Sequence, residues 1–331
     1  MNRSALKRLL GWMEENGFSR FFLVRPENFA WLTGGGDSTV VAGEGVAWLE
    51  VAKGKVRLHT SCIEAGRLVA EEVAGVDEVL SYPWHAMPDP GRPNDLEHDL
   101  TPLRLVLSPE EQERFRALGR DAAQALGKVV RAARPEWTER KLAGEVAAAL
   151  YARGIQPVVL LAAGEERIFK YRHPLPKDRP LGRLAMAVVC GRREGLVANL
   201  TRIRSWGRPE AEGLYEKVLS LEAAALDATR PGATLGEVLT AIQEAYYEIG
   251  RPQALEEHHQ GGIAGYRPRE VLATPGDGTR LEVGMAVAWS PSLPGAKVED
   301  TFLITERGLE NLTFDPAWPT CLLYTSPSPR D

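Results

Sequence analysis

The sequence predicts an α/β (α+β) protein with a small amino-terminal domain and a larger domain built from two similar halves. Three observations support this prediction. The chain has 331 residues, and because a domain usually holds roughly 100–200 residues, two domains are expected. The stretch 82–99 is dense in proline, glycine and aspartate. A sequence pattern that starts at Arg134 returns 96 residues later, at Arg230.

The first domain is predicted to span residues 1–104. Residues 4–16 carry leucine and methionine at helical spacing, which predicts an amphipathic helix. Residues 21–24, Phe-Phe-Leu-Val, predict a short buried strand. Proline fixes φ and glycine loosens it, so the stretch 82–99 cannot continue a helix or a central strand. We therefore place the domain junction just beyond it.

The second domain is predicted to span residues 105–320 and to begin with a long helix. Ser108 is suited to cap this helix, and Pro109 follows at the first helical position. Two glutamates come next, where acidic side chains meet the positive end of the helix dipole. The helix is expected to continue to about residue 133.

Two similar units follow the long helix. The first has Arg-Pro-x-x-Thr at 134–138 and a glycine at 154, and the second repeats this pattern at 230–234 and 250. Each threonine is suited to cap a helix and each glycine to end it. Strand-like runs follow the helices at 158–164, 184–191, 282–290 and 298–306. We expect two helix-helix-strand-hairpin halves related by pseudo-symmetry, with their strands in one curved antiparallel sheet under the helices.

Composition and charge argue against several classes of protein. Hydrophobic residues make up 44% and charged residues 26%, as in ordinary globular proteins. A net charge of −5 provides no basic face for nucleic acid. Neither a spanning apolar run nor a signal peptide is evident, so we expect no membrane association and a cytoplasmic location. Three widely spaced cysteines do not indicate a disulfide framework. Residues 321–331 change composition abruptly and look like a translated sequencing-adapter or vector scar.

Short motifs in both domains resemble one family of proteins. Residues 26–34 read Pro-x-Asn-x-x-Trp-Leu-Thr-Gly. The motifs of the second domain are, in chain order, His173-Pro174, Cys190-Gly191, Asn199-Leu200-Thr201-Arg202, 258–270, 281–285 and 297–305. Their order and spacing resemble the pita-bread family that contains aminopeptidase P, prolidase, methionine aminopeptidase and creatinase. The resemblance implies a pita-bread domain with an internal pseudo-twofold repeat, a smaller creatinase-type amino-terminal domain and a homodimer.

The same resemblance implies where a metal centre would lie. Peptidases of this family hold two divalent metals with two aspartates, one histidine and two glutamates. Carried over in order, these places fall on Cys190, Asn199, Gly262, Ser290 and Glu299, so four of the five ligands are replaced. Bridging carboxylates neutralise two neighbouring cations, which an amide, a hydroxyl and a glycine cannot do. We expect no dinuclear centre, no bound metal and no cofactor. Gly261 and Gly262 indicate either a bulge or a close approach of another backbone segment, or room for a larger group where the family's histidine is missing.

Three residues are candidate catalytic groups, namely His173, His258 and Glu299. The resemblance places both histidines at substrate-facing positions, and an imidazole with its ordinary pKa near ~6.5 exchanges a proton at neutral pH. His258 and His259 are adjacent, so a strand would point them to opposite faces and only one would face the pocket. The alternatives are that the histidines are structural and that Glu299 only pairs with Lys297 on a strand.

Further residues are predicted to line a substrate pocket. Arg202, Tyr266, Arg269 and Lys297 are expected to hold a carboxylate, with ordinary surface side chains as the alternative. Cys190 is interpreted as a small core residue, with a thiolate nucleophile and a ligand of a single zinc ion as alternatives. The predicted lining set is His259, Cys190, Asn199, Arg202, Tyr266, Arg269, Ser290 and Lys297.

Three functions are compatible with these residues. The favoured one is a metal-independent hydrolase of C–N bonds in small amino-acid derivatives or short peptides, as the resemblance to creatinase implies. A histidine would then move the proton, Glu299 would orient a nitrogen, and Arg269 or Arg202 would bind a carboxylate. The second is a catalytically inactive pseudoenzyme that binds peptides or small molecules. The third is an Xaa-Pro aminopeptidase or dipeptidase with an unusual metal site.

Overall fold

The structure is a computed structural model that describes residues 1–41 and 43–319. These residues divide into two compact units. One holds Met1–Glu111 together with Glu194–Leu196, and the other holds Gln112–Arg193 and the chain from Val197 on. The boundary between the two units, at Glu111 and Gln112, lies in the first turn of the helix that begins at Pro109. This is shortly after the boundary predicted at residue 104. The predicted scar at 321–331 lies outside the described residues. Among the described residues, no helix is long and apolar enough to cross a membrane.

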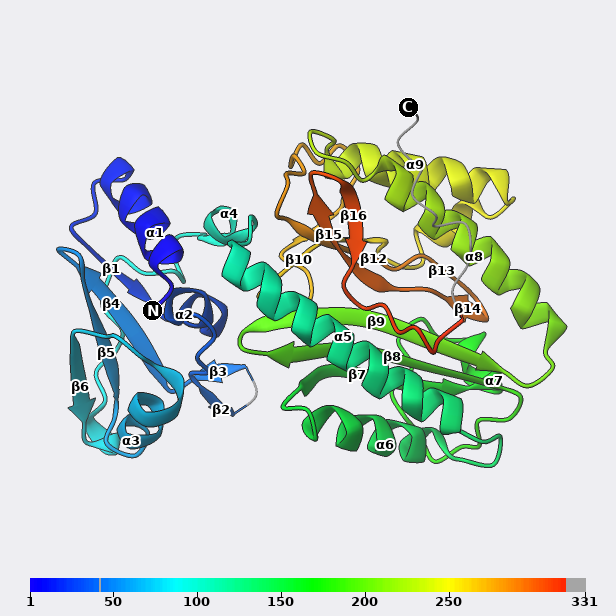
Figure 1. Ribbon diagram of the computed structural model, residues 1–331, viewed down its shortest axis with the longest axis horizontal. Helices are drawn as coiled ribbons and strands as arrows, with labels where there is room; N and C mark the ends of the chain where they lie inside the picture. The colour runs from blue at the N-terminus through cyan, green and yellow to red at the C-terminus, as the bar shows by residue number, and fades with distance from the viewer. Residues whose placement is uncertain (42, 320–331) are drawn as a thin grey trace. The chain divides into compact units, whose positions relative to one another are not determined.

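The first unit is built on a four-stranded sheet with the order β1-β4-β5-β6. Neighbouring strands are antiparallel except for the parallel pair β5–β6. Figure 1 shows α1 beside this sheet. Asn2 caps α1 by accepting a hydrogen bond from the backbone N–H of Ala5, and Ala5, Leu9 and Met13 of α1 are buried. The elements are α1 Arg3–Glu15, β1 Arg20–Leu23, α2 Pro26–Thr33, β2 Thr39–Val41, β3 Glu44–Gly45, β4 Ala47–Ala52, β5 Lys55–Ser61, α3 Ala65–Arg67, β6 Glu78–Tyr82 and α4 Thr101–Arg104.

The motif at 26–34 forms α2, and its asparagine stabilises the first unit. Asn28 is 1% exposed. Its Nδ2 donates to Asp95 Oδ2 at 2.8 Å, and its Oδ1 accepts from Arg104 Nη1 at 2.6 Å. Buried polar groups are costly unless they are hydrogen-bonded, so this asparagine joins α2 to the segment that closes the unit.

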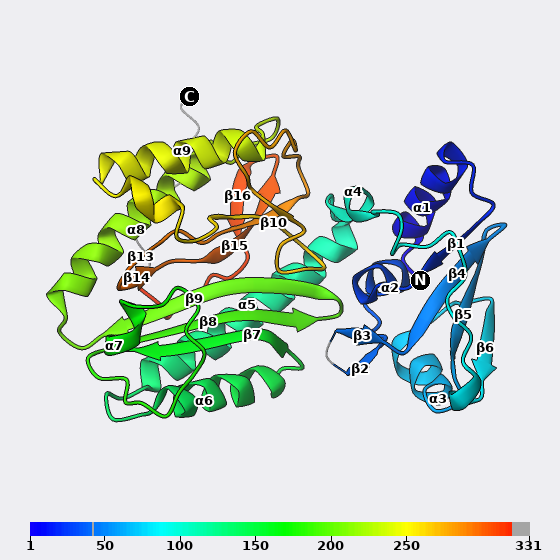
Figure 2. The same cartoon turned by 180° about the vertical axis from the view of Figure 1, so that it is seen from behind.

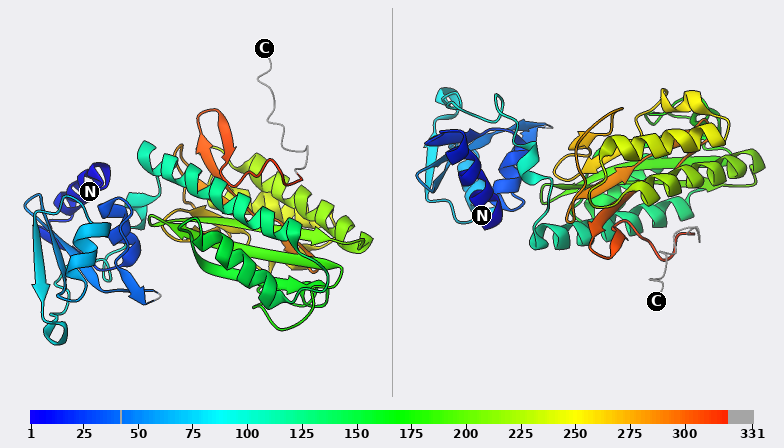
Figure 3. Two further views of the ribbon diagram at one scale, coloured as in Figure 1. Left: turned by 60° about the horizontal axis from the view of Figure 1, so that its bottom comes forward. Right: turned by 90° about the horizontal axis from the view of Figure 1, so that it is seen from above.

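The second unit contains two long helices in each half. Figure 1 and the reverse view in Figure 2 show α5 crossing one face of the sheet β7-β8-β9, and Figure 3 gives two further views of the same layers. The elements are α5 Pro109–Ala132, α6 Glu139–Tyr151, β7 Gln156–Gly164, α7 Glu165–Ile168, β8 Leu184–Arg193, β9 Leu196–Ser205, α8 Pro209–Ala228, α9 Leu235–Glu248, β10 Gly261–Ala264, β11 Val271–Leu272, β12 Ala286–Trp289, β13 Ser292–Leu293, β14 Ala296–Lys297, β15 Asp300–Thr305 and β16 Gly308–Asn311.

The internal repeat predicted from the sequence is present in the structure. Thr138 caps α6 and Thr234 caps α9, each by accepting a hydrogen bond from a backbone N–H in the first helical turn. Each threonine also forms an isolated β-bridge to a later loop, Thr138 to Pro180 and Thr234 to Arg280. In both halves, therefore, a threonine caps the second helix and also joins it to a later loop through a β-bridge.

The strands of the second unit do not form the single sheet that the sequence suggested. Within the described residues, β7-β8-β9 form one sheet, β11-β10-β12-β15-β16 form another, and β13–β14 form a separate hairpin. An isolated bridge between Thr201 and Glu299 connects the first two sheets. The two halves meet at this bridge, and polar side chains gather around it.

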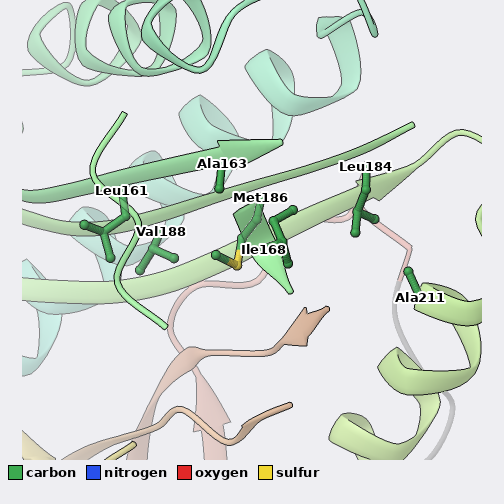
Figure 4. Close-up of a cluster of buried hydrophobic side chains, with 7 residues drawn as sticks. All are labelled: Leu161, Ala163, Ile168, Leu184, Met186, Val188 and Ala211. Carbon is green, nitrogen blue, oxygen red and sulfur yellow. The ribbon is translucent and has the colours of Figure 1, made fainter. Parts of the chain in front are cut away.

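One face of the sheet β7-β8-β9 carries a buried apolar cluster (Figure 4). Alternate side chains of β7 and β8 pack there against α7 and α8. Val188 of β8 and Ile203 of β9 share this face. Because side chains alternate along a strand, Cys190 and Asn199 lie on the same face, next to the cluster. The nine-residue spacing thus keeps both positions on one side of the sheet, as predicted.

Candidate functional site

Glu299 lies at the centre of a buried group of charges. Its side chain is 4% exposed, and those of Arg269 and Lys297 are 10% and 6% exposed. Oε1 accepts a hydrogen bond from Arg269 Nη2 at 2.7 Å, and Lys297 Nζ lies 3.4 Å from Oε2. Thr201 Oγ1 donates to Oε2 at 3.0 Å. Burial alone raises the pKa of Glu299, but Lys297 and Arg269 outweigh it and lower the pKa to about 2.

The local backbone explains why these groups converge. Lys297 pairs with Ser292 in the hairpin β13–β14, and Glu299 follows two residues later. The backbone N–H of Thr201 donates to the carbonyl oxygen of Glu299 at 2.9 Å, which brings β9 against this segment. Thr201 was not predicted as a site residue. Its position two residues after Asn199 on a strand, and hence on the same face, is the signal that could have found it.

Three histidines gather beside the charge group. His173 lies in the loop after α7, and His258 and His259 lie between α9 and β10. The Nε2 atoms of His173 and His258 are 3.0 Å apart. The rings of His258 and His259 are stacked with centroids 4.5 Å apart, and one ring nitrogen of each of the three histidines lies within 4.8 Å of the others.

The expectation that a strand points the two adjacent histidines to opposite faces is wrong. They lie in a bend that follows a short 3₁₀ turn at Pro252–Leu255, so the alternation of a strand does not apply. Instead, His258 and His259 both contact His173 through their rings. The bend therefore brings the three imidazoles close together.

The three histidines are neutral at neutral pH. Burial, reinforced by the charge of Lys297, lowers the pKa of His258 to about 2. His173 and His259 are exposed over part of their surface; the covered part of each ring, together with the charge of Lys297 for His173 and of Arg269 for His259, lowers the pKa of His173 and lowers that of His259 to about 4. Neutral imidazole keeps a lone pair on one ring nitrogen, so each ring can accept a proton or bind a metal.

Cys190 and Asn199 occupy the two positions where the resemblance implies aspartates. Cys190 is 7% exposed, and burial together with the charge of Glu299 raises the pKa of its thiol to about 12. It is therefore a protonated thiol at neutral pH, which disfavours a nucleophilic role. Asn199 is fully buried, and its Oδ1 has no hydrogen-bond partner within the described part of the chain.

Gly262 and Ser290 occupy two further positions. Gly262 has φ +152°, and a Cβ there would lie 2.1 Å from the carbonyl oxygen of Val271. Of the two interpretations of this glycine, the close backbone approach is confirmed and the room for a larger group is wrong, because the neighbouring backbone fills that space. Ser290 is fully buried, and no partner for its Oγ is found in residues 1–41 and 43–319.

Two of the predicted carboxylate-binding residues are engaged elsewhere. Arg202 is 5% exposed, and its Nη2 donates to Asp300 Oδ1 at 3.0 Å and to the carbonyl oxygen of Thr313 at 2.8 Å. The hydroxyl of Tyr266 accepts a hydrogen bond from Arg114 at 3.2 Å. Of the four predicted residues, Arg269 and Lys297 are the two that contact Glu299.

Comparisons with known proteins agree with this architecture. The sequence profile described as metallopeptidase family M24 matches residues 113–306, and the profile described as creatinase/prolidase N-terminal domain matches residues 6–139. A protein named Xaa-Pro dipeptidase from Pyrococcus furiosus is 25% identical, over 94% of this chain and 98% of that protein.

Solved structures show the same fold. The prolidase from Pyrococcus furiosus matches with a TM-score of 0.76 at 20% identity, over 92% of this chain and 99% of that chain. The Xaa-Pro dipeptidase from Bacillus anthracis matches with a TM-score of 0.74 at 17% identity, over 94% and 97%. The two-domain pita-bread architecture is therefore shared with these structures.

Proposed function

Because the chain belongs to metallopeptidase family M24 and carries a creatinase/prolidase-type amino-terminal domain, we propose that it hydrolyses a C–N bond in small amino-acid derivatives or short peptides without the dinuclear metal centre of that family. The proposal rests mainly on one observation. Glu299 is the one carboxylate left among the five positions of the family's ligand set, and it forms ion pairs with Arg269 and Lys297.

The residues around Glu299 do not fit a dinuclear centre. Two divalent ions bring four positive charges, and bridging carboxylates normally offset them. Here a single carboxylate already faces two protein cations within 3.4 Å. Asn199 and Ser290 contribute dipoles without charge, and the thiol of Cys190 stays protonated. In this proposal the guanidinium and ammonium groups take the electrostatic place of the metals.

The charge balance favours a substrate with a carboxylate. Two cations and one carboxylate leave one net positive charge in a buried site, which attracts an anionic group. Arg269 Nε has no hydrogen-bond partner among the described residues. Guanidinium binds carboxylates through paired N–H donors, so Arg269 is the residue proposed to bind the free carboxylate of an amino acid or peptide.

The histidine pair supplies the proton transfer. Since His173 and His258 are neutral and their Nε2 atoms are 3.0 Å apart, one ring donates its N–H to the lone pair of the other. His173 is exposed and accepts a proton from water as the water oxygen attacks the carbonyl carbon. The proton then passes to the departing nitrogen as the C–N bond breaks. Glu299 holds Arg269 and Lys297 in place during this step.

A binding protein without turnover is the second candidate. The buried oxygens of Asn199 and Ser290 lack partners in the described chain, so a bound ligand could satisfy them without any reaction. A third candidate follows from the relatives, whose names include Xaa-Pro dipeptidase. In that case the activity would require metal.

Turnover assays separate the three candidates. The full chain is assayed on Xaa-Pro dipeptides and on small N-substituted amino acids, with a chelator, with added manganese and with added cobalt. We expect activity that resists the chelator, that metals do not raise, and that Glu299→Gln and His173→Ala remove. Glu166→Gln, an exposed change in a surface ion pair with Lys170, is the matched control and retains activity. Metal-stimulated, chelator-sensitive cleavage contradicts the proposal, and ligand binding without turnover favours the second candidate.

Dimerisation and a cytoplasmic location stay predictions of the resemblance. We propose a homodimer because two-domain members of the family usually form one. Light scattering on the purified full chain measures the mass directly, and a mass near 36.3 kDa would indicate a monomer instead.

A further inference from the structure

We propose that His173, His258 and His259 bind a single divalent transition-metal ion, at a place separate from the five positions of the family's dinuclear centre. One ring nitrogen of each histidine lies within 4.8 Å of the others. Zinc binds imidazole nitrogen at about 2.0–2.1 Å, so two imidazoles on one tetrahedral ion have nitrogens roughly 3.3 Å apart. The 3.0 Å separation of the Nε2 atoms of His173 and His258 is close to that value.

The hydrogen bonding of the cluster is incomplete without a ligand. His258 is 7% exposed, and its Nδ1 has no partner within the described residues. Its Nε2 faces the Nε2 of another neutral histidine, so a single proton is shared between two nitrogens. A buried ring nitrogen without a partner costs free energy, and a ligand bound to that nitrogen removes the cost.

The donor set determines the class of ion. Three neutral imidazoles suit Zn²⁺, Cu²⁺ and Ni²⁺, whereas Mg²⁺, Ca²⁺ and Mn²⁺ prefer oxygen ligands. His173 and His259 are exposed, which leaves the cluster accessible to ions and leaves positions for water on the metal.

The surrounding charges limit the site to one ion. The charges of Lys297 and Arg269 act on the histidines, and Glu299 offsets one of these two charges. Arg172 and Glu257, next to the histidines in the chain, form an ion pair and add no net charge. The remaining positive charge opposes every cation, and the charge of a first bound ion adds to it, so a second ion is disfavoured much more strongly than the first.

Metal binding has a consequence that rests on the proposed function. The lone pairs that hold the ion are the ones proposed to accept a proton. An ion in the cluster therefore inhibits turnover, whereas metal activates a metallopeptidase. Binding itself does not depend on the proposed function.

The test is a titration of the chelator-treated full chain with Ni²⁺ and Cu²⁺, followed by calorimetry and by visible absorption of the bound ion. We expect one ion per chain with the absorption of nitrogen coordination. His173→Ala and His259→Ala, both changes of exposed side chains, are each expected to weaken binding at least about tenfold. His85→Ala is the matched control, because His85 is an exposed histidine of the other unit.

The outcomes are distinct. Stoichiometry of one that falls only in the His173 and His259 variants supports the inference. No binding, two ions per chain, or an equal loss in His85→Ala overturns it. A chain that binds one ion but turns over nothing supports the metal site and contradicts the proposed hydrolase, and a chain that is active and binds no ion does the reverse.

Discussion

Replacing Glu299 with glutamine tests the electrostatic account of the site. Gln keeps the size of the side chain and an oxygen for Thr201, but it leaves Arg269 and Lys297 without their shared counter-charge. All three charged side chains are at most 10% exposed, so solvent screens little of the change. Removing one partner of a buried ion pair costs about 3–5 kcal/mol. In a domain of this size that corresponds to a fall in Tm of about 6–20 °C.

The assay is urea and thermal unfolding of wild type, Glu299→Gln, Lys297→Met and the double variant. In the Glu299→Gln variant, both Lys297 and Arg269 lack a counter-charge, and Lys297→Met removes one of these two cations. Lys297→Met should therefore lower the free energy of unfolding less in the Glu299→Gln variant than in wild type, or even raise it. We expect a coupling energy of at least about 1 kcal/mol between the two positions. A Glu299→Gln variant within about 0.5 kcal/mol of wild type, or two changes that simply add, would refute the reasoning.

Three further predictions concern positions of the family's ligand set. Gly262→His should not restore a metal site, and it should lower the free energy of unfolding by more than about 2 kcal/mol. The reason is that φ at this position is +152° and the carbonyl oxygen of Val271 fills the space. Metal titration checks the first result, and denaturation checks the second. Cys190 should resist alkylation in the native chain at pH 8 while the exposed Cys62 reacts, as peptide mass mapping would show. Because the pKa of Cys190 is raised from 9.0 to about 12, its protonated form favours folding below pH 9, and stability should fall as pH rises, by roughly 1 kcal/mol at pH 10. In urea unfolding at different pH values, Cys190→Ala should remove this loss of stability between pH 9 and pH 10.

Local signals in the sequence located the helices α1, α5, α6 and α9. Ser108 with Pro109 predicted the start of α5, which spans Pro109–Ala132, and the repeated threonines predicted the caps of α6 and α9. The glycines after these helices, Gly154 and Gly250, have φ of +66° and +71°. These features depend on a few neighbouring residues, so one sequence is enough to find them.

The arrangement of the strands depended on distant contacts and was predicted less well. The sequence does not show that the strands divide into two main sheets, which the described residues join through the bridge between Thr201 and Glu299 and through hydrogen bonds between Asn199 and Thr301. Such pairing is set by packing between segments about 100 residues apart. A close backbone approach at Gly262 was one of the two interpretations of that glycine, but the sequence did not indicate which strand supplies the neighbouring carbonyl.

At the site, the sequence predicted which residues take part better than it predicted which residues they contact. Nothing in the sequence separates the role of Arg202 from that of Arg269, yet Arg202 pairs with Asp300 and Arg269 pairs with Glu299. The pairing of Glu299 with Lys297 was foreseen as the structural alternative, because residues two apart on a strand share a face. The grouping of three histidines was not foreseen, since it requires a bend where a strand was expected.

The most direct test of the central claim is the number of cobalt ions that the chelator-treated full chain binds, read by absorption and calorimetry. The account predicts at most one Co²⁺ per chain, with binding that His259→Ala weakens and Glu299→Gln leaves in place. Two Co²⁺ ions per chain, both lost in Glu299→Gln, would show that the protein cations do not replace the family's metals and would contradict the account.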